Sequence, residues 1–170
     1  MKTFLLALGF SLICASSQVD PAEVTGDWHT ILMGADDLEK ISEYGEMRFH
    51  YRHLDCSDGG KKIDFTFYSK SNGECQKFFV RSSKGPHDIY EVKYKGQNFF
   101  QIEYLSDGVV VFYNINVDGN GKVTHMTVLA SKEDNLSEEV HKKFEELTVE
   151  NNIPKENIRH VIETDNCPDV

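Results

Sequence analysis

The stretch GVVVFYNINV, which runs from Gly108 to Val117, decides the fold, because as a β-strand it has no polar face. An ordinary half-buried strand alternates apolar with polar residues, so this strand needs a cover on both sides. One of its two rows also ends in carboxamides, and a buried carboxamide needs a hydrogen-bond partner. The rows are Val109, Val111, Tyr113 and Ile115 on one side, and Val110, Phe112, Asn114 and Asn116 on the other.

The sequence around this stretch is a run of short strands separated by glycine-containing turns such as Lys95-Gly96. Eight strands at this spacing predict one all-β domain, an antiparallel up-and-down meander that forms a barrel or a sandwich. The expected strands are 26–34, 46–55, 62–70, 74–82, 88–95, 98–105, 108–117 and 122–131.

Most of these strands are apolar on one face and charged on the other, which favours a barrel around an apolar interior. Arg48, Arg52 and Glu103 belong to the charged, outward row. The inward row also contains Phe78, Tyr90, Val92, Ile102 and Val110. The residues expected to line a ligand cavity are Met47, Phe49, Tyr51, Phe65, Phe67, Val80, Tyr94, Asn98, Phe100, Phe112, Asn114, Met126 and Val128.

The hydrophobic period becomes helical after Ser137, the expected N-cap residue. Val140, Phe144 and Leu147 follow at i, i+4 and i+7, and the helix is expected to end near residues 151–152. If this helix packs outside the barrel over strand 108–117, it covers the outward row of that strand. A short final strand is expected within 157–162.

The N-terminus has the pattern of a secretory signal peptide, with a basic Lys2 followed by an apolar run and small residues. Ala15 and Ser17 suit the −3 and −1 positions of a cleavage site, so residues 1–17 are the expected signal and 18–170 the mature domain. The apolar run is too short to span a bilayer. We therefore expect a secreted, extracellular protein.

Cleavage before Gln18 would remove Lys2 and no acidic residue, so the formal net charge of −10 would become −11. Such a surface repels a phosphate backbone, which argues against nucleic acid and anionic membranes as partners. The charge is typical of a soluble protein in a secreted fluid.

Several stretches together resemble the lipocalin family. "TGDWHT" contains Gly26 and Trp28 of the family's Gly-x-Trp signature, and "YKGQNFFQI", "NINVDGNG" and "IETDNCP" are similar to stretches of the odorant-binding protein, aphrodisin and probasin branch. The resemblance implies an eight-stranded antiparallel barrel with one C-terminal helix packed outside. It also implies that Lys132 stacks over Trp28 in a cation–π contact.

Three cysteines remain after the signal, an odd number that leaves one without an intramolecular partner. The resemblance implies a disulfide between Cys75 and Cys167. Close relatives carry a second, local bridge, but Gly60 stands where its second cysteine would be. Cys56 is therefore expected either to be a free thiol or to join two chains.

Other candidate sites are weaker. His50 and His53 alternate across a strand and are expected to be surface histidines, so we predict no metal site and no cofactor. A thiol-dependent lipocalin isomerase would need Cys56 as nucleophile, but the neighbouring Asp55 and Asp58 would raise its pKa. The sequon that begins at Asn135 also contains the expected helix cap, so its glycosylation is left open.

The sequence thus predicts a carrier, not an enzyme, that binds a small hydrophobic volatile of the odorant or pheromone class. A ligand of about ten to fifteen heavy atoms is expected to bind in the micromolar range. The alternative is a barrel filled with side chains that acts through its exterior on a protein partner or receptor. Asn114 either contacts the ligand or only bonds Asn98 or the backbone at the barrel rim. Monomer and homodimer both stay open.

Overall fold

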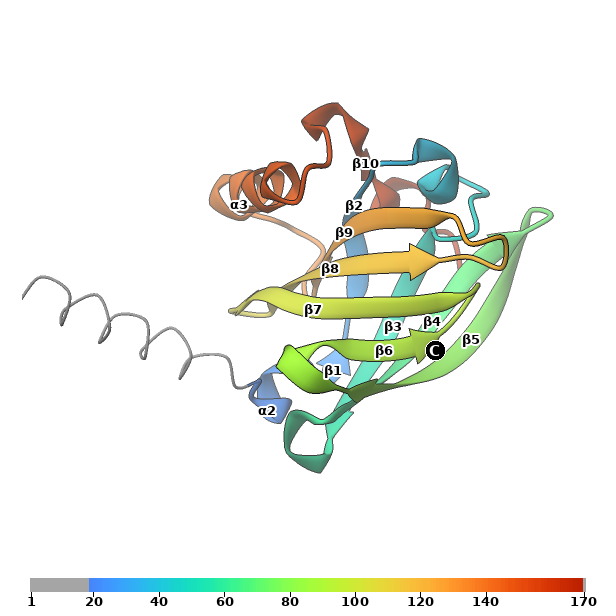
Figure 1. Ribbon diagram of the computed structural model, residues 1–170. Helices are drawn as coiled ribbons and strands as arrows, with labels where there is room; N and C mark the ends of the chain where they lie inside the picture. Colours follow the sequence, from blue (N-terminus) through green and yellow to red (C-terminus); the bar gives the residue numbers. More distant parts are fainter. Residues whose placement is uncertain (1–18, 170) are drawn as a thin grey trace, which may run out of the picture.

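The computed structural model describes residues 19–169, and the expected signal peptide, residues 1–17, lies outside the described residues. The described chain forms one curled antiparallel sheet with a helix, α3 (Glu138–Glu150), on its outer side (Figure 1). A short helix, α2 (Pro21–Val24), precedes the sheet. The strands are β1 (Gly26–Asp27), β2 (His29–Ala35), β3 (Phe49–Ser57), β4 (Lys62–Ser71), β5 (Glu74–Lys84), β6 (Tyr90–Lys93), β7 (Gln97–Ser106), β8 (Val109–Val117), β9 (Val123–Ser131) and β10 (Ile158–His160).

The sheet has ten strands, in the order β1-β3-β4-β5-β6-β7-β8-β9-β2-β10, where the sequence predicted eight strands of a barrel and a short final strand. The difference arises because Trp28 divides the first expected strand into β1 and β2. The expected final strand is β10, which joins the edge of the sheet beside β2. β1 pairs with β3 and β2 pairs with β9. The N-terminal segment therefore holds both margins of the meander together and closes the curled sheet.

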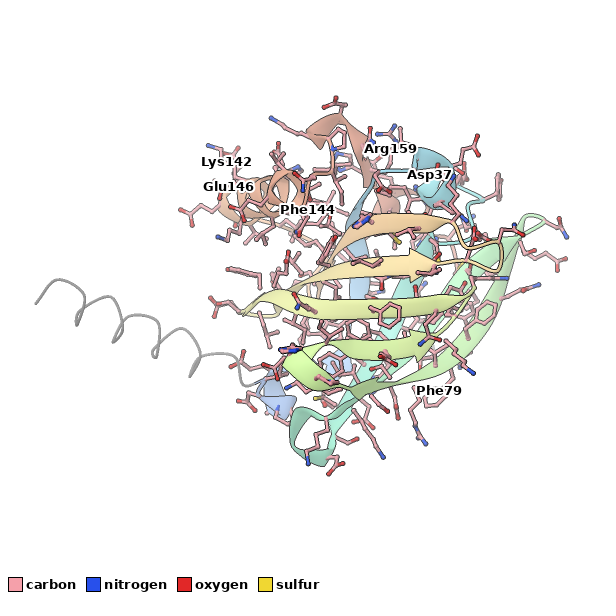
Figure 2. All side chains as sticks on the ribbon, in the orientation of Figure 1. Asp37, Phe79, Lys142, Phe144, Glu146 and Arg159 are labelled. Carbon is pink, nitrogen blue, oxygen red and sulfur yellow. A yellow bond between two sulfur atoms is a disulfide. The ribbon has the colours of Figure 1, made fainter. Side chains whose placement is uncertain are left out.

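Helix α3 begins after Ser137, whose Oγ accepts a hydrogen bond from the backbone N of Val140 over 3.3 Å. Phe144 points from the helix toward the sheet, and Lys142 and Glu146 point away from it (Figure 2). The helix thus packs on the outer face of the sheet as predicted, over β9 and the beginning of β8. Its apolar face packs in a cluster with Ile31, Leu32, Val109, Val111 and Leu129.

The helix covers only the first half of the outward row of β8. Val109 and Val111 are buried, whereas Tyr113 and Ile115 are half-exposed. Tyr113 is partnered by His125 instead, at 2.5 Å between its hydroxyl and the imidazole Nδ1. The sequon residue Asn135 is exposed just before the helix.

The C-terminal segment crosses the outer face of β3 and β4, and this contradicts the expectation of a solvated charged face there. Arg48 and Arg52 are 6% and 4% exposed, and His50, expected on the surface, is 1% exposed. Arg52 pairs with Asp165 of that segment. Alternation along β3 gave the correct face for these side chains, but it carried no information about the distant segment that covers them.

Within residues 19–169, no helix is both long and apolar enough to cross a bilayer. The same part of the chain contains no cluster of three or more His, Cys, Asp or Glu side chains suited to a metal ion.

Candidate ligand-binding site

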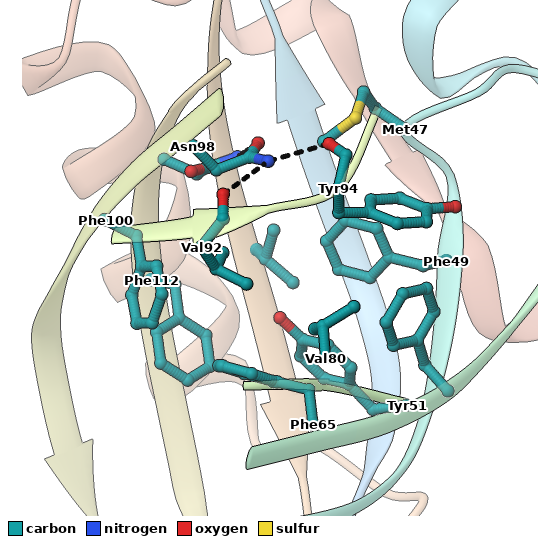
Figure 3. A pocket seen from close by; sticks show the side chains of 13 residues that line it. Met47, Phe49, Tyr51, Phe65, Val80, Val92, Tyr94, Asn98, Phe100 and Phe112 are labelled. Atoms are coloured by element: carbon teal, nitrogen blue, oxygen red, sulfur yellow. Dashed lines mark hydrogen bonds between the residues drawn. The ribbon is translucent and has the colours of Figure 1, made fainter. Parts of the chain in front are cut away.

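A cavity of about 50 Å³ lies inside the curled sheet (Figure 3). Side chains from β3, β4, β5, β6, β7, β8 and β9 form its wall, because inward-facing residues alternate with outward-facing ones along each strand. The lining is mostly aromatic and aliphatic, which suits an apolar ligand. The lining residues are Met47, Phe49, Tyr51, Phe65, Phe67, Val80, Val92, Tyr94, Asn98, Phe100, Phe112, Asn114 and Val128.

Every residue expected to line the cavity does so, except Met126. Its side chain is fully buried beside the cavity, and its sulfur lies 3.9 Å from Nδ2 of Asn114. Val92 lines the cavity but was not among the expected residues, although it shares their parity. Its position opposite Asn98 in the β6–β7 ladder could have identified it.

The aromatic side chains pack against one another and leave little free space. Phe112 meets Tyr51 edge-on at 6.1 Å and Phe100 edge-on at 5.6 Å between ring centroids, and Phe65 meets Phe100 at 5.4 Å. At about 10–15 Å³ for each water molecule, the cavity has room for about three to five waters. This is smaller than the expected ligand of about ten to fifteen heavy atoms, which enters only if aromatic rings move.

Asn98 is the centre of a buried hydrogen-bond network at one end of the cavity. Its Nδ2 donates to the carbonyl oxygens of Tyr94 over 2.8 Å and of Val92 over 3.3 Å (Figure 3). Its Oδ1 accepts from Nδ2 of Asn114 and from Nδ2 of Asn116, each over 3.0 Å. The Nδ2 groups of Asn114 and Asn116 on β8 are thus paired through Asn98 of β7, whereas the Oδ1 atoms of these two carboxamides have no partner among the described residues.

Two fully buried polar atoms of the cavity-lining side chains have no hydrogen-bond partner among the described residues. These are the carboxamide Oδ1 of Asn114 and the hydroxyl of Tyr94. Asn114 is 7% exposed. Burial raises the pKa of Tyr94, so its phenol stays protonated at neutral pH. A buried unpaired polar group marks a place where a water or a ligand binds.

The Gly-x-Trp segment closes the opposite end of the sheet. Lys132 Nζ lies 5.2 Å from the centroid of the Trp28 ring and donates to the carbonyl oxygen of Thr25 over 3.2 Å. Gly26 has φ +148°, and a Cβ there would lie 3.2 Å from Lys132 Cε. Glycine stands at this position because the lysine crosses directly over it.

The cysteines are arranged as predicted from the resemblance: Cys75 and Cys167 form a disulfide, and Cys56 is a buried free thiol. Burial raises the pKa of Cys56, and the nearby carboxylate of Asp55 adds to the effect. The expected cause was the carboxylates alone. Cys56 does not line the cavity, so it is poorly placed to act on a bound molecule.

The curled antiparallel sheet with an internal apolar cavity defines the class of small up-and-down β-barrels that enclose a ligand site. The chain belongs to the lipocalin family, because residues 25–165 match the family model described as Lipocalin / cytosolic fatty-acid binding protein family. It is 44% identical over 170 residues to lipocalin Cav p 2.0101 of Cavia porcellus, with 99% of each chain covered.

Solved structures give the same relationship. Aphrodisin, described as a sex pheromone from female hamster, superposes with a TM-score of 0.84 at 37% identity over 86% of this chain and 99% of that chain. A complex of bovine odorant-binding protein with undecanal has a TM-score of 0.64 at 35% identity over 90% of this chain and 98% of that chain. The relatives thus lie in the odorant-binding protein and aphrodisin branch of the family.

Proposed function

We propose that this protein is a secreted carrier that binds a small hydrophobic volatile, of the odorant or pheromone class, in the cavity inside its sheet. The observation that carries the proposal is the cavity wall, which is aromatic and aliphatic apart from a few convergent polar groups. The relatives described as odorant-binding proteins support it. The signal-like N-terminus supports secretion into an extracellular fluid.

The protein acts without a cofactor, as a monomer or homodimer, and not as an enzyme. The buried, weakly acidic thiol of Cys56 speaks against an isomerase. Nucleic acids and membranes are not among its proposed partners.

Displacement of a fluorescent apolar probe from the purified protein tests this function. Saturable binding in the micromolar range is expected, and Phe112→Ala should weaken it by about tenfold through loss of apolar contact. Phe79→Ala is the matched control, because Phe79 is 62% exposed outside the barrel. Equal effects of the two variants would place the bound probe outside the cavity.

The small cavity also supports a second candidate, a filled barrel that binds a protein partner or receptor through its exterior. The aromatic side chains of the wall already contact one another without a ligand. For this candidate, the folded protein should show no saturable displacement of the probe by any small apolar compound.

A further inference from the structure

We infer that the cavity selects an apolar ligand that carries one hydrogen-bond donor, an alcohol or a phenol, over the ketone or aldehyde with the same carbon skeleton. The inference rests on the proposed function, since it requires a ligand in the cavity. Its basis is the fixed direction of the buried carboxamides of Asn98 and Asn114.

The backbone sets the direction of Asn98. The carbonyl oxygens of Val92 and Tyr94 only accept hydrogen bonds, so the side chain of Asn98 must present its Nδ2 to them, at 3.3 and 2.8 Å. Its Oδ1 then faces the other way, toward β8. Turning the amide over would bring Oδ1 against two carbonyl oxygens and leave three acceptors unpaired.

The direction of Asn98 in turn sets the direction of Asn114. Because Oδ1 of Asn98 only accepts, Asn114 must present its Nδ2 there, and it does so over 3.0 Å. Asn116 does the same from the next inward position of β8, also over 3.0 Å. Asn114 is therefore left with its own Oδ1 unpaired while its side chain lines the cavity.

An unpaired carboxamide oxygen discriminates between ligands. A ligand hydroxyl can donate to Oδ1 of Asn114, whereas a ketone oxygen would meet it with lone pair against lone pair. Asn114 cannot reverse to serve the ketone without losing its bond to Asn98. The hydroxyls of Tyr94 and Tyr51, which also belong to side chains that line the cavity, both donate and accept, so they favour neither ligand.

Cyclohexanol and cyclohexanone are suitable probes, with methylcyclohexane as the hydrocarbon control, each titrated by displacement of the fluorescent compound. The quantity measured in each variant is the ratio of the dissociation constants of cyclohexanone and cyclohexanol. The difference in hydration between these two ligands is the same for every variant, so it cancels when the ratios are compared. In Asn98→Leu, Asn114 is free to present either end, so the preference for the alcohol should fall about five- to tenfold. Asn114→Leu should abolish the preference for the alcohol. Methylcyclohexane should bind this variant as tightly as it binds the unaltered protein, or more tightly.

Asn116→Leu is the matched control. It also removes a buried carboxamide bonded to Asn98, but Asn116 does not line the cavity and Asn98 stays held by its backbone partners. The alcohol preference should therefore equal that of the unaltered protein. If Asn98→Leu does not fold, Asn98→Ala, which leaves room for water, replaces it.

The inference would be overturned if the ratio of dissociation constants in Asn114→Leu, or in the folded Asn98 variant, equalled that of the unaltered protein. It would also be overturned if the ratio of the unaltered protein, divided by that of Asn114→Leu, showed no preference for cyclohexanol over cyclohexanone. In both cases the carrier function would stand, since the probes still bind. If no compound displaces the probe, the proposed function fails and the inference falls with it.

Discussion

The guanidinium of Arg52 and the carboxylate of Asp165 form a two-pronged ion pair, with N···O distances of 2.7 and 2.8 Å, across 113 residues of sequence. Arg52 also donates to the carbonyl oxygens of Pro168 and Cys167. The two charged side chains are 4% and 5% exposed. This pair therefore fixes the end of the chain against β3.

Removing one charge of this pair should destabilise the protein strongly. In Asp165→Asn, Arg52 is left buried without its counter-charge, and the free energy of unfolding should fall by about 3–5 kcal/mol in a urea titration. Asp64→Asn is the control, because its partner Arg81 is 66% exposed, and its loss should be at most about 1 kcal/mol. Similar losses in the two variants would show that the Asp165 pair is solvated.

Stability should fall between pH 6.5 and pH 4 because of His50. Burial lowers its pKa to about 4, against the effect of Asp165 and with that of Lys70, Arg48 and Arg52. The unfolded chain, with a histidine pKa of about 6.5, therefore binds a proton in this range that the folded chain does not. The stability present above pH 6.5 is lost as the pH falls, by up to about 3 kcal/mol.

Urea titrations at several pH values in this range measure the effect, and His50→Gln should flatten the curve there. The carboxyl of Asp165 affects the free energy of unfolding at lower pH than His50 does. Burial alone would raise its pKa, but the hydrogen-bonded Arg52 holds it below its ordinary value of 3.8. Its contribution is lost only below that pH, so the two groups can be separated. A pH-independent stability between 6.5 and 4 in the unaltered protein would contradict the role of His50.

Phe144→Asp should lower the free energy of unfolding by several kcal/mol, about 3–5, since it places an unpaired charge between α3 and the sheet. Phe144 is fully buried, whereas Val149 of the same helix is 52% exposed. Val149→Asp is therefore the matched control and should change the melting temperature little. An unchanged melting temperature for Phe144→Asp would show that the helix is not docked over β8.

Mass mapping without reductant should find Cys75 joined to Cys167 and Cys56 unmodified. The disulfide closes a span of 92 residues, which corresponds to about 4–5 kcal/mol on the chain-entropy estimate, so replacing both cysteines by serine should lower stability by about that amount. Cys56, at 6% exposed, should react with a thiol reagent only on unfolding. Finding Cys56 bridged to either of the others would refute the pairing.

Alternation along the strands was sufficient to predict most of the cavity wall. Phe100, Phe112 and Asn114 were placed correctly because a strand presents every second side chain to the same face. The position of α3 followed from the same logic, since the outward row of β8 needed an apolar cover. Met126 faces inward as predicted, opposite Asn114, but it does not line the cavity, because parity gives the face of a side chain and not whether it reaches the free space.

Features that depend on distant segments could not be predicted in this way. The burial of His50 depends on the C-terminal segment, which lies over 110 residues away in sequence from β3. The free volume depends on the rotamers of the facing rings, and these follow from packing across the barrel, not from local sequence. The direction of Asn114 depends on two backbone carbonyls of the β6–β7 hairpin, which no side-chain pattern records.

The disulfide also determines what a protease could do to this protein. The turn at Gly119–Val123 is exposed, and it lies between Cys75 and Cys167 in the chain. A single cut there would give two fragments that stay covalently joined and still paired through β8 and β9. Such a nicked chain would migrate as one band without reductant and as two with it, with both halves of the cavity wall still in place.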